Sequence, residues 1–343
     1  MGNLLSKGFE YQTGICAMQN AWHGVHVNNS AEMRRIVKKK TVDVIIPAYK
    51  PGEEFRELLA RLLKQTVMPE HIFILQTVED GEELLKFEED CIKVFPIQKA
   101  EFDHGGTRDY GARLSGADYI LFMTQDAMPK NEGLIEELLK GVTINHVGMA
   151  YGRQLARKDA DITEQLARQY NYPPESRLKT RADLENLGIK TYFCSDVCAM
   201  YDRNLYLELG GFVHPTIFNE DTIMASRMIQ AGYGVYYAAE AKVIHSHSYT
   251  CMQQFRRNFD LGVSQKEYSE VFENISSEKE GAGFAKKTIL VLCGRLHFFK
   301  AFYFAWQCAF RLFGYKMGKN YDRLPKRMVL WCTMSPSYWS REE

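Results

Sequence analysis

Between residues 42 and 244, runs of apolar residues that suit strands alternate with segments whose apolar spacing suits helices. The first run, 42–47, reads Val-Asp-Val-Ile-Ile-Pro and is almost wholly apolar, as in a parallel sheet covered on both faces. Leucines and a phenylalanine at helical spacing follow in 53–64. Such β-α-β alternation predicts an open α/β sheet. Further strands are predicted at 71–76, 91–96, 119–124, 147–151 and 235–244, and helices at 82–87, 107–115, 134–139 and 221–230.

Length and charge predict three parts. The chain has 343 residues, 45% of them hydrophobic, which is enough for one large core and an appendage. Its formal net charge is zero. Nevertheless residues 285–343 hold eleven Lys and Arg against three acids, and residues 1–40 are basic too. We expect an N-terminal extension at 1–40, an α/β domain at 41–250, and a basic, aromatic helical region at 251–343.

The C-terminal region contains a predicted helix at 296–313 that is rich in Phe, Tyr and Trp. Its polar residues fall within one narrow arc, and Lys300 and Arg311 interrupt the apolar run, which argues against a membrane span. The helix could pack on the main domain, or it could lie in a membrane interface with its cations at the headgroups. The surrounding positive charge favours membrane contact. Its aromatic residues cluster in one apolar helix, which does not suit nucleic-acid binding.

Two groups of carboxylates follow predicted strands and are candidates for chemistry. Asp126 comes directly after the buried strand 119–124, and a carboxylate there can bind a divalent cation that bridges a diphosphate. Asp221, preceded by Glu220, could be a general base. Taken singly, each Asp also suits a turn or a helix cap. Open α/β sheets bind ligands at the carboxyl ends of their strands, so both groups are expected at one crevice.

Three other segments are candidates for the same crevice. His245 and His247 end a strand at alternate positions and are expected to share a face, where one could join Asp126 on a metal. The segment 102–109 has two glycines before a helix, where a backbone can approach a phosphate and Arg108 could clamp it. A plain glycine turn is the alternative. Asp196 is expected on the acceptor side from its position alone.

Five segments in order resemble family 2 glycosyltransferases, over roughly residues 41–250. The resemblance implies a GT-A fold, which is a Rossmann-like open mixed sheet. Within that family the chain looks most like bacterial rhamnosyltransferases that build cell-wall or O-antigen polysaccharide from dTDP-rhamnose. The segments are Val44-Ile45-Ile46-Pro47-Ala48-Tyr49, Gly105-Gly106-Thr107-Arg108-Asp109-Tyr110-Gly111-Ala112, Ala117 to Asp126, Gly210-Gly211-Phe212 and Asn219-Glu220-Asp221.

The resemblance implies an inverting sugar transfer to a hydroxyl of a lipid-linked saccharide, at the cytoplasmic face of the plasma membrane. Asp126 would bind Mg²⁺ or Mn²⁺, and Asp221, with Glu220, would provide the general base. The family's D-x-D motif reads Thr124-Gln125-Asp126 here, so one carboxylate is missing and His245 or His247 is expected to replace it. The residues expected at the donor are Ala48, Tyr49, Gln76, Thr77, His104, Arg108 and Gln125. A second copy of the chain as a partner is left open.

Two other functions compete with sugar transfer. A nucleotidyltransferase usually carries a Gly-rich, Lys-containing loop after its first strand, and the loop 48–52 (Ala-Tyr-Lys-Pro-Gly) fits that poorly. A non-catalytic, membrane-docked module that binds a sugar nucleotide is the other alternative, and turnover of a sugar nucleotide would exclude it.

Overall fold

The computed structural model describes residues 40–247, 249–272 and 277–340, so the expected extension at 1–40 lies outside the described residues except for Lys40. The strands are β1 Val42–Tyr49, β2 His71–Val78, β3 Ile92–Gln98, β4 Tyr119–Met123, β5 Met128–Pro129, β6 Val147–Leu155, β7 Arg177–Lys179, β8 Cys198–Asp202 and β9 Gly234–Ile244. The helices of the α/β part are α1 Glu53–Leu62, α2 His104–Leu114, α3 Leu134–Val142, α4 Ile162–Asn171, α5 Leu184–Leu187, α6 Arg203–Glu208 and α7 Glu220–Gln230. Those that follow are α8 Cys251–Glu267, α9 Ser269–Phe272, α10 Ser277–Gly294, α11 Phe298–Gly318, α12 Lys326–Cys332 and α13 Pro336–Trp339.

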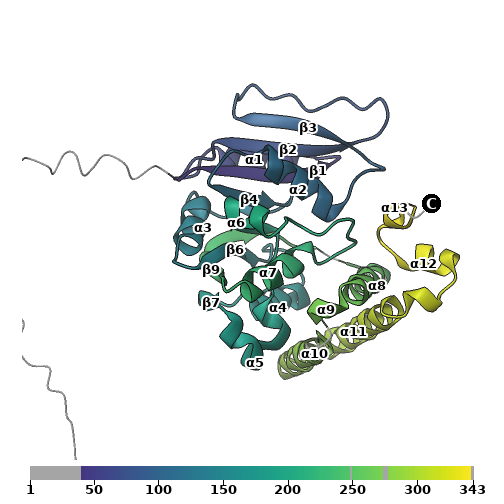
Figure 1. Cartoon of the computed structure of the whole chain (residues 1–343). Helices are drawn as coiled ribbons and strands as arrows, with labels where there is room; N and C mark the ends of the chain where they lie inside the picture. The colour runs from purple at the N-terminus through teal and green to yellow at the C-terminus, as the bar shows by residue number, and fades with distance from the viewer. Residues whose placement is uncertain (1–39, 248, 273–276, 341–343) are drawn as a thin grey trace, which may run out of the picture. The chain divides into compact units, whose positions relative to one another are not determined.

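The strands form one mixed sheet in the order β3-β2-β1-β4-β8-β6-β9-β5, with β7 added beside β9 (Figure 1). β1 is parallel to β2 and β4. β8 is antiparallel to both β4 and β6, so β4 and β6 run the same way, and β9 is parallel to β6. The carboxyl ends of β1, β2, β4, β6 and β9 therefore lie along one edge of the sheet. This arrangement confirms the predicted open mixed α/β sheet.

Both faces of the sheet are buried, which explains the near-continuous apolar strands. Successive side chains of β1 alternate between the faces: Val44 and Ile46 join the core beneath α1 and α3, whereas Ile45 joins the core beneath α2, α6 and α7. In α1, apolar residues at helical spacing point inward, and Leu58 and Leu62 are fully buried.

The predicted helix at 82–87 is wrong. The segment has no regular secondary structure, and a side chain at the end of β2 bonds to its backbone. The amide of Gln76 donates to the backbone oxygen of Glu83 at 3.1 Å and accepts from the backbone N–H of Leu85 at 2.8 Å. These bonds satisfy backbone groups that a helix would have paired internally.

The turn at Gly210 and Gly211 packs against α2, the helix that contains Gly105 and Gly106. Asp109 of α2 accepts a hydrogen bond from the Tyr206 hydroxyl at 3.1 Å, and the turn at Gly211 closes over it. Gly211 has a φ of +72°, and a Cβ there would meet the Asp109 Oδ1 at 2.0 Å. A side chain at this position is therefore disfavoured by both backbone strain and lack of space.

Replacing Gly211 by Ala is expected to lower the free energy of unfolding by about 2–4 kcal/mol, through overpacking and a left-handed backbone. Gly81 is the matched control, since its φ is +84° and nothing lies within 4 Å of a Cβ placed there. Gly81→Ala is expected to cost about 1 kcal/mol, from backbone strain alone. Urea unfolding measures both, and equal losses would show that Asp109 does not restrict this turn.

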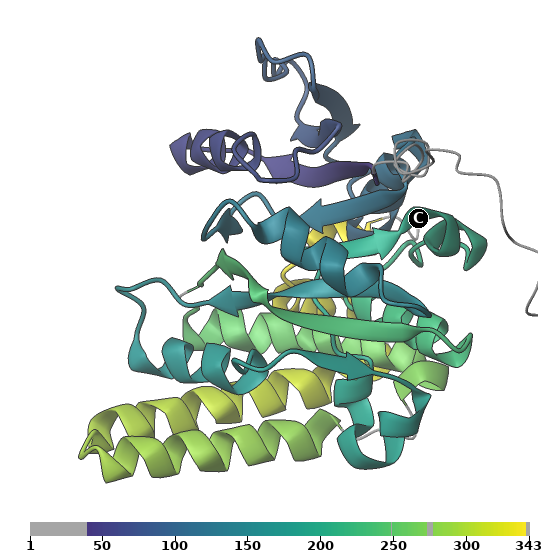
Figure 2. The same cartoon turned by 90° about the vertical axis from the view of Figure 1, so that its left-hand side faces the viewer.

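The helices after β9 pack on one another and on the α/β part (Figure 2). α11 runs alongside both α8 and α10. Phe255 and Phe259 of α8 form a core with Ile217, a residue just before α7. None of the helices in the described ranges is long and apolar enough to cross a membrane.

Candidate active site

Asp126, His245 and His247 meet at the carboxyl edge of the sheet, where β4 and β9 end. The His247 Nε2 lies 3.3 Å and the His245 Nε2 3.5 Å from the Asp126 Oδ2. One ligand atom of each of the three residues lies within 4.8 Å of the others. His245 and His247 leave β9 at alternate positions and share a face, as the sequence predicts. The donor set of one carboxylate and two imidazoles fits a divalent cation.

The electrostatics suit a metal. Burial would raise the pKa of Asp126, but the hydrogen bond and charge of His245 outweigh it, so that pKa lies below its ordinary value. Burial lowers the pKa of His247 to about 4, with a further contribution from His245. His247 is therefore neutral at physiological pH, and only the neutral imidazole has a lone pair for a cation.

Gln154 of β6 holds His245 in place. Its Oε1 lies 2.9 Å from the His245 Nδ1, so a proton on that nitrogen leaves Nε2 free to face Asp126. Gln154 in turn donates to the Tyr172 hydroxyl at 2.6 Å and to the Ser195 Oγ at 2.9 Å, and Arg168 donates to its Oε1. The amide is 2% exposed and its orientation is fixed from both ends.

Replacing Gln154 by Met is expected to weaken Mn²⁺ binding about 10- to 100-fold, because His245 loses its orienting acceptor. Gln154→Glu keeps an acceptor oxygen of similar reach and is expected to retain most of the affinity. Electron paramagnetic resonance of free Mn²⁺ measures the dissociation constants. Equal loss in the two variants would show that Gln154 acts through packing instead.

Asp221 lies at the start of α7, beside a second buried carboxyl. Its Oδ1 accepts from the backbone N–H of Thr222 at 2.6 Å, and its Oδ2 from the backbone N–H of Asp196 at 3.4 Å. Burial, followed by the charge of Glu220, raises the pKa of Asp221 to about 6. A carboxylate with such a pKa is ionised at neutral pH and basic enough to accept a proton from a reacting hydroxyl.

The C-terminal helix α8 fixes the backbone at Phe218 and Asn219, directly before Glu220 and Asp221. Asn219 has a φ of +66°, a conformation that Asn tolerates better than most residues. Its side-chain amide donates to the Ser264 Oγ of α8 at 3.0 Å, and that hydroxyl donates to the Phe218 oxygen at 2.6 Å. α8 therefore sets the position at which Asp221 enters the site.

Asp196 lies next to Asp221, but its carboxyl is buried and 3% exposed. The Tyr201 hydroxyl donates to its Oδ1 at 2.7 Å, whereas its Oδ2 is buried without a hydrogen-bond partner. Burial, followed by the charge of Asp221, raises the pKa of Asp196 well above its ordinary value. The expected acceptor-side residue thus lies beside Asp221, with its own carboxyl buried.

A chain of contacts joins Asp221 to the cluster of Asp126, His245 and His247. The backbone of Asp196 donates to Asp221, its neighbour Ser195 accepts from Gln154, and Gln154 holds His245 against Asp126. The structure therefore brings the two groups of candidates together at one edge of the sheet.

Glu220 and Arg108 form a buried ion pair, with the Arg108 Nη1 3.2 Å from the Glu220 Oε1. Arg108 is 5% exposed and its Nη1 also donates to the His104 backbone oxygen at 3.0 Å. Burial lowers the pKa of His104 to about 4, so its ring is neutral. These three residues link the start of α2 to the start of α7.

The interpretation of 102–109 as a phosphate-binding turn does not match the contacts there. The start of α2 is capped by Asp103, whose Oδ1 accepts from the Gly106 N–H at 2.6 Å. At Gly105 a Cβ would meet the Val213 backbone oxygen at 2.1 Å, so this glycine allows two protein segments to touch. Helix capping and backbone packing thus account for Asp103 and Gly105.

The donor candidates on β1 and β4 are joined by a side-chain bridge. Gln125 accepts from the Tyr49 N–H at 2.7 Å and donates to the Tyr49 oxygen at 3.2 Å, which ties the two strand ends together. The Tyr49 ring is 39% exposed, and its hydroxyl donates to Glu79 at 2.8 Å. Ala48 is buried in β1 immediately before it.

The two candidates on β2 are buried. The amide of Gln76 is occupied by the backbone of the 83–85 segment. The Thr77 Oγ1 is buried without a hydrogen-bond partner. Glu79, which sequence reasoning missed, lies beside them. Hydrogen bonds from Lys99, Tyr49 and Lys50 lower the pKa of Glu79 to about 2, so it is a fixed anion.

Gln154, Ser195 and Tyr172 are the other residues that sequence reasoning missed. Each looks like an ordinary polar or aromatic residue in a strand or loop, and no motif singles it out. Their importance arises from contacts between residues that lie 18 to 91 positions apart.

Known proteins resemble the chain over most of its length. Residues 43–210 match the model of the family described as Glycosyl transferase family 2. The chain is 36% identical over 302 residues to the O-antigen chain rhamnosyltransferase RfbN of Salmonella typhimurium (strain LT2), covering 87% of this chain and 96% of that protein. It is also 36% identical over 300 residues to the O-antigen chain rhamnosyltransferase WbaN of Salmonella anatum, covering 87% and 95%.

A solved structure supports the fold. The mannosyltransferase PcManGT from Pyrobaculum calidifontis, in complex with GDP-Man and Mn²⁺, superposes with a TM-score of 0.54 and 13% identity. The match covers 82% of this chain and 88% of that one. At this identity the likeness shows the GT-A fold alone. The two relatives and the family model show that this chain belongs to glycosyl transferase family 2.

Proposed function

We propose that this chain transfers L-rhamnose from dTDP-rhamnose to a hydroxyl of a lipid-linked saccharide, with inversion at the sugar carbon, in bacterial polysaccharide synthesis. The single observation that carries this proposal is the contact chain from Asp221, a carboxylate poised as a base, to the Asp126, His245 and His247 cluster. The choice of rhamnose follows from the two relatives, both of which are O-antigen chain rhamnosyltransferases.

The proposed reaction is a single displacement. Asp221 accepts the proton of the acceptor hydroxyl while the oxygen of that hydroxyl attacks the anomeric carbon. The bond from the anomeric carbon to the diphosphate breaks at the same time, and dTDP leaves. A cation held by Asp126, His245 and His247 would neutralise the charge that develops on the leaving diphosphate. Asp196 would position Asp221 through its backbone N–H, and Arg108 would hold Glu220 beside it through their ion pair.

Mn²⁺ is the proposed cation in preference to Mg²⁺. Two imidazole nitrogens face one carboxylate in this cluster, whereas Mg²⁺ prefers oxygen ligands and its own water. On the nucleotide side, the exposed Tyr49 ring would stack on the base, and Thr77 would offer its buried hydroxyl nearby.

Turnover of a panel of sugar nucleotides tests the function. With Mn²⁺ and a lipid-linked saccharide fraction, dTDP-rhamnose is expected to give dTDP and a rhamnosylated lipid, and UDP-glucose and GDP-mannose are expected to give little. Preference for another donor would overturn the rhamnose assignment while leaving sugar transfer intact. Binding without turnover of any donor would favour the non-catalytic module.

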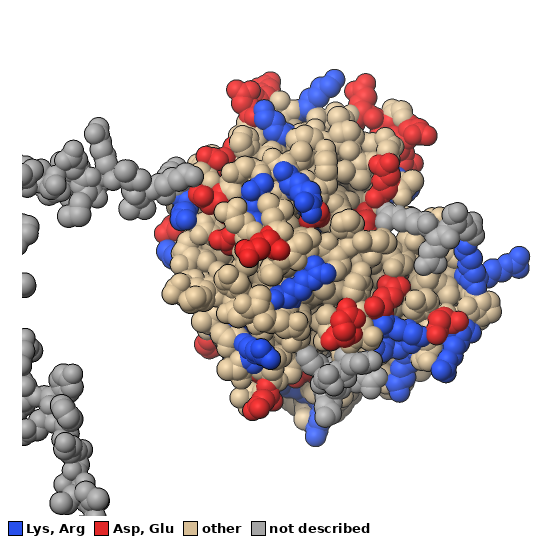
Figure 3. All heavy atoms as spheres, viewed as in Figure 1, with Lys and Arg blue, Asp and Glu red and all other residues tan. Residues whose placement is uncertain are grey.

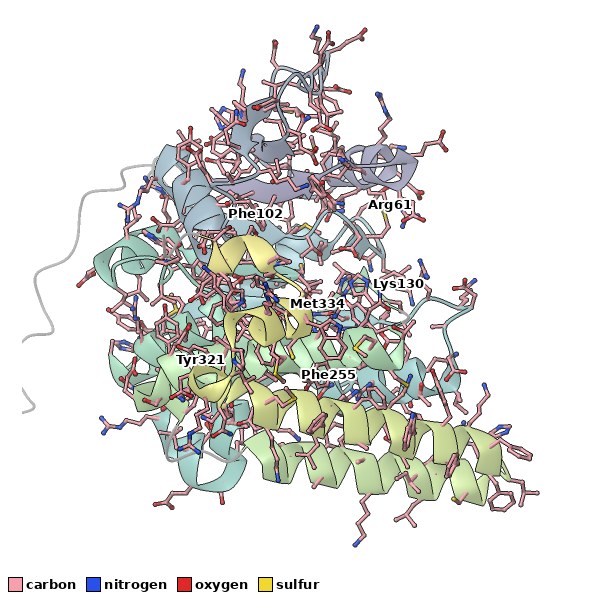
Figure 4. All side chains as sticks on the ribbon, turned by 90° about the vertical axis from the view of Figure 1, so that its right-hand side faces the viewer. Arg61, Phe102, Lys130, Phe255, Tyr321 and Met334 are labelled. Carbon is pink, nitrogen blue, oxygen red and sulfur yellow. The ribbon has the colours of Figure 1, made fainter. Side chains whose placement is uncertain are left out.

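The C-terminal helices carry a surface suited to a membrane, which supports the proposal that the chain acts at a membrane surface. Large apolar side chains of α11 are exposed, with Phe299 at 94% and Phe302 at 76%. Figure 4 shows the paired helices α10 and α11 projecting with side chains directed away from the ribbon, and Figure 3 shows Lys and Arg gathered over the C-terminal helices. Exposed aromatic residues beside cations match an anionic bilayer surface.

Replacing Phe299 and Phe302 together by Ser is expected to lower the fraction bound to anionic vesicles about tenfold or more, since each ring buries apolar area in the interface. Vesicle flotation measures this fraction. Tyr110→Ser with Leu114→Ser is the control, because those side chains of α2 are 42% and 38% exposed and lie outside this surface. Equal flotation of both double variants would remove the membrane role from α11.

A further inference from the structure

A cavity of about 360 Å³ lies between the end of β6 and α4. Four of the residues that line it are cations, and the lining, all within the described part of the chain, contains no acid. Three glutamines and a tyrosine add polar groups. The four cations are Arg153, Arg157, Lys158 and Arg168.

Nearby acids neutralise only part of this charge. Arg168 pairs with Glu164 at 2.8 Å, and Arg157 approaches the exposed Asp159 at 3.6 Å. The Arg153 Nε is buried without a hydrogen-bond partner. A lining of this kind favours an anion that accepts several hydrogen bonds, and a phosphate does so.

The cavity adjoins the cluster of Asp126, His245 and His247. Gln154 lines the cavity and also contacts the His245 Nδ1 at 2.9 Å. The end of β6 pairs with the end of β9, Leu155 opposite Ile244, directly before His245. Tyr49 and Thr77 lie farther along the sheet, on β1 and β2, and β4 and β8 separate these strands from β6.

α4 connects the cavity to the exposed C-terminal helices. One face of α4 lines the cavity with Gln165, Arg168 and Gln169. The other face packs against α10 and α11 through Ile162 and Leu166. At the start of α4, the Lys300 Nζ of α11 lies 2.6 Å from the Asp161 Oδ2. The cavity is thus one helix away from the proposed membrane surface.

We propose that this cavity binds the phosphate groups through which the acceptor saccharide is joined to its lipid. This inference rests on the proposed function, because it takes the acceptor to be lipid-linked. A lipid-linked acceptor would place its phosphate groups in the cavity and its lipid tail toward α10 and α11, and its saccharide would extend toward Asp221. A donor phosphate has the same chemistry, so the test must separate the two sources.

The test uses inorganic pyrophosphate as a probe of the cavity and dTDP with Mn²⁺ as a probe of the donor site. Arg157 and Lys158 are exposed, so their joint replacement by Gln leaves the core untouched. Calorimetry in chelator is expected to show pyrophosphate binding to the wild type, weakened about tenfold or more in this variant, because two charge-assisted contacts are lost. The dissociation constant of dTDP with Mn²⁺ is expected to stay within about twofold.

Arg56→Gln with Lys64→Gln is the matched control, which removes the same two charges from exposed positions in and just after α1 and is expected to bind pyrophosphate like the wild type. No pyrophosphate binding by the wild type, or equal binding by the variant, would overturn the proposal. Weaker dTDP binding by the variant would assign the cavity to the donor. If the proposed function is wrong, dTDP-rhamnose will not be turned over. Pyrophosphate binding is measured without turnover, so the two failures can be told apart.

Discussion

Asp221→Asn is expected to lower the rate of sugar transfer about 10³-fold or more, because an amide cannot accept the proton of the acceptor hydroxyl. Binding of dTDP is expected to be unchanged, since Asp221 accepts its hydrogen bonds from Thr222 and from the Asp196 backbone and not from the nucleotide residues. The measurement is initial-rate transfer with donor affinity determined in parallel. Asp80→Asn, an exposed acid after β2, is the control and should retain full activity.

The same carboxyl sets the expected pH dependence. Its pKa is raised to about 6, and the base acts only when ionised, so kcat is expected to fall about tenfold per unit as pH drops below 6 and to level off above it. The raised pKa also means that folding favours the protonated form, so the ionised carboxyl costs stability at neutral pH. Asp221→Asn should therefore be no less stable than the wild type at pH 7.

If Asp221→Asn keeps its stability and loses transfer, the loss arises from the chemical step and not from unfolding. Substantial transfer by Asp221→Asn, or a kcat that is flat from pH 5 to 8, would instead remove Asp221 from the role of base. Glu220 would not be the next choice, because its carboxylate already pairs with the buried Arg108.

Asp126→Ala is expected to lower transfer about 10²- to 10³-fold and to abolish its dependence on Mn²⁺, since this residue provides the only carboxylate in the cluster. Wild-type activity should disappear on dialysis against chelator and return with Mn²⁺, more fully than with Mg²⁺. His245→Ala and His247→Ala should each raise the Mn²⁺ concentration required, because the remaining two ligands bind more weakly.

Asp90→Ala, an exposed acid in the loop before β3, is the matched control for Asp126→Ala. Direct binding of Mn²⁺ gives a second readout that does not depend on activity, and the Asp126 variant should lose it. Full transfer by the wild type in chelator would eliminate the metal role, whatever the binding data show.

Local pattern predicted much of the α/β part. Continuous apolar runs such as 42–47 mark strands that are buried on both faces, and the alternation of His245 and His247 placed both imidazoles on one side. The prediction of a helix at 82–87 was wrong because the spacing of apolar residues shows only which side chains a helix there could bury. It could not show that the Gln76 amide would capture the backbone there.

By itself, the sequence determined the residue types at the strand ends and the family to which their order points. The tertiary structure alone decided which of these ends meet. β8, antiparallel to its neighbours, sets β4 and β6 in the same direction, so Asp126, Gln154 and His245 converge from three strands. A local pattern reports which face of an element is buried, whereas pairing between distant strands depends on packing across the whole sheet, and no short segment encodes it.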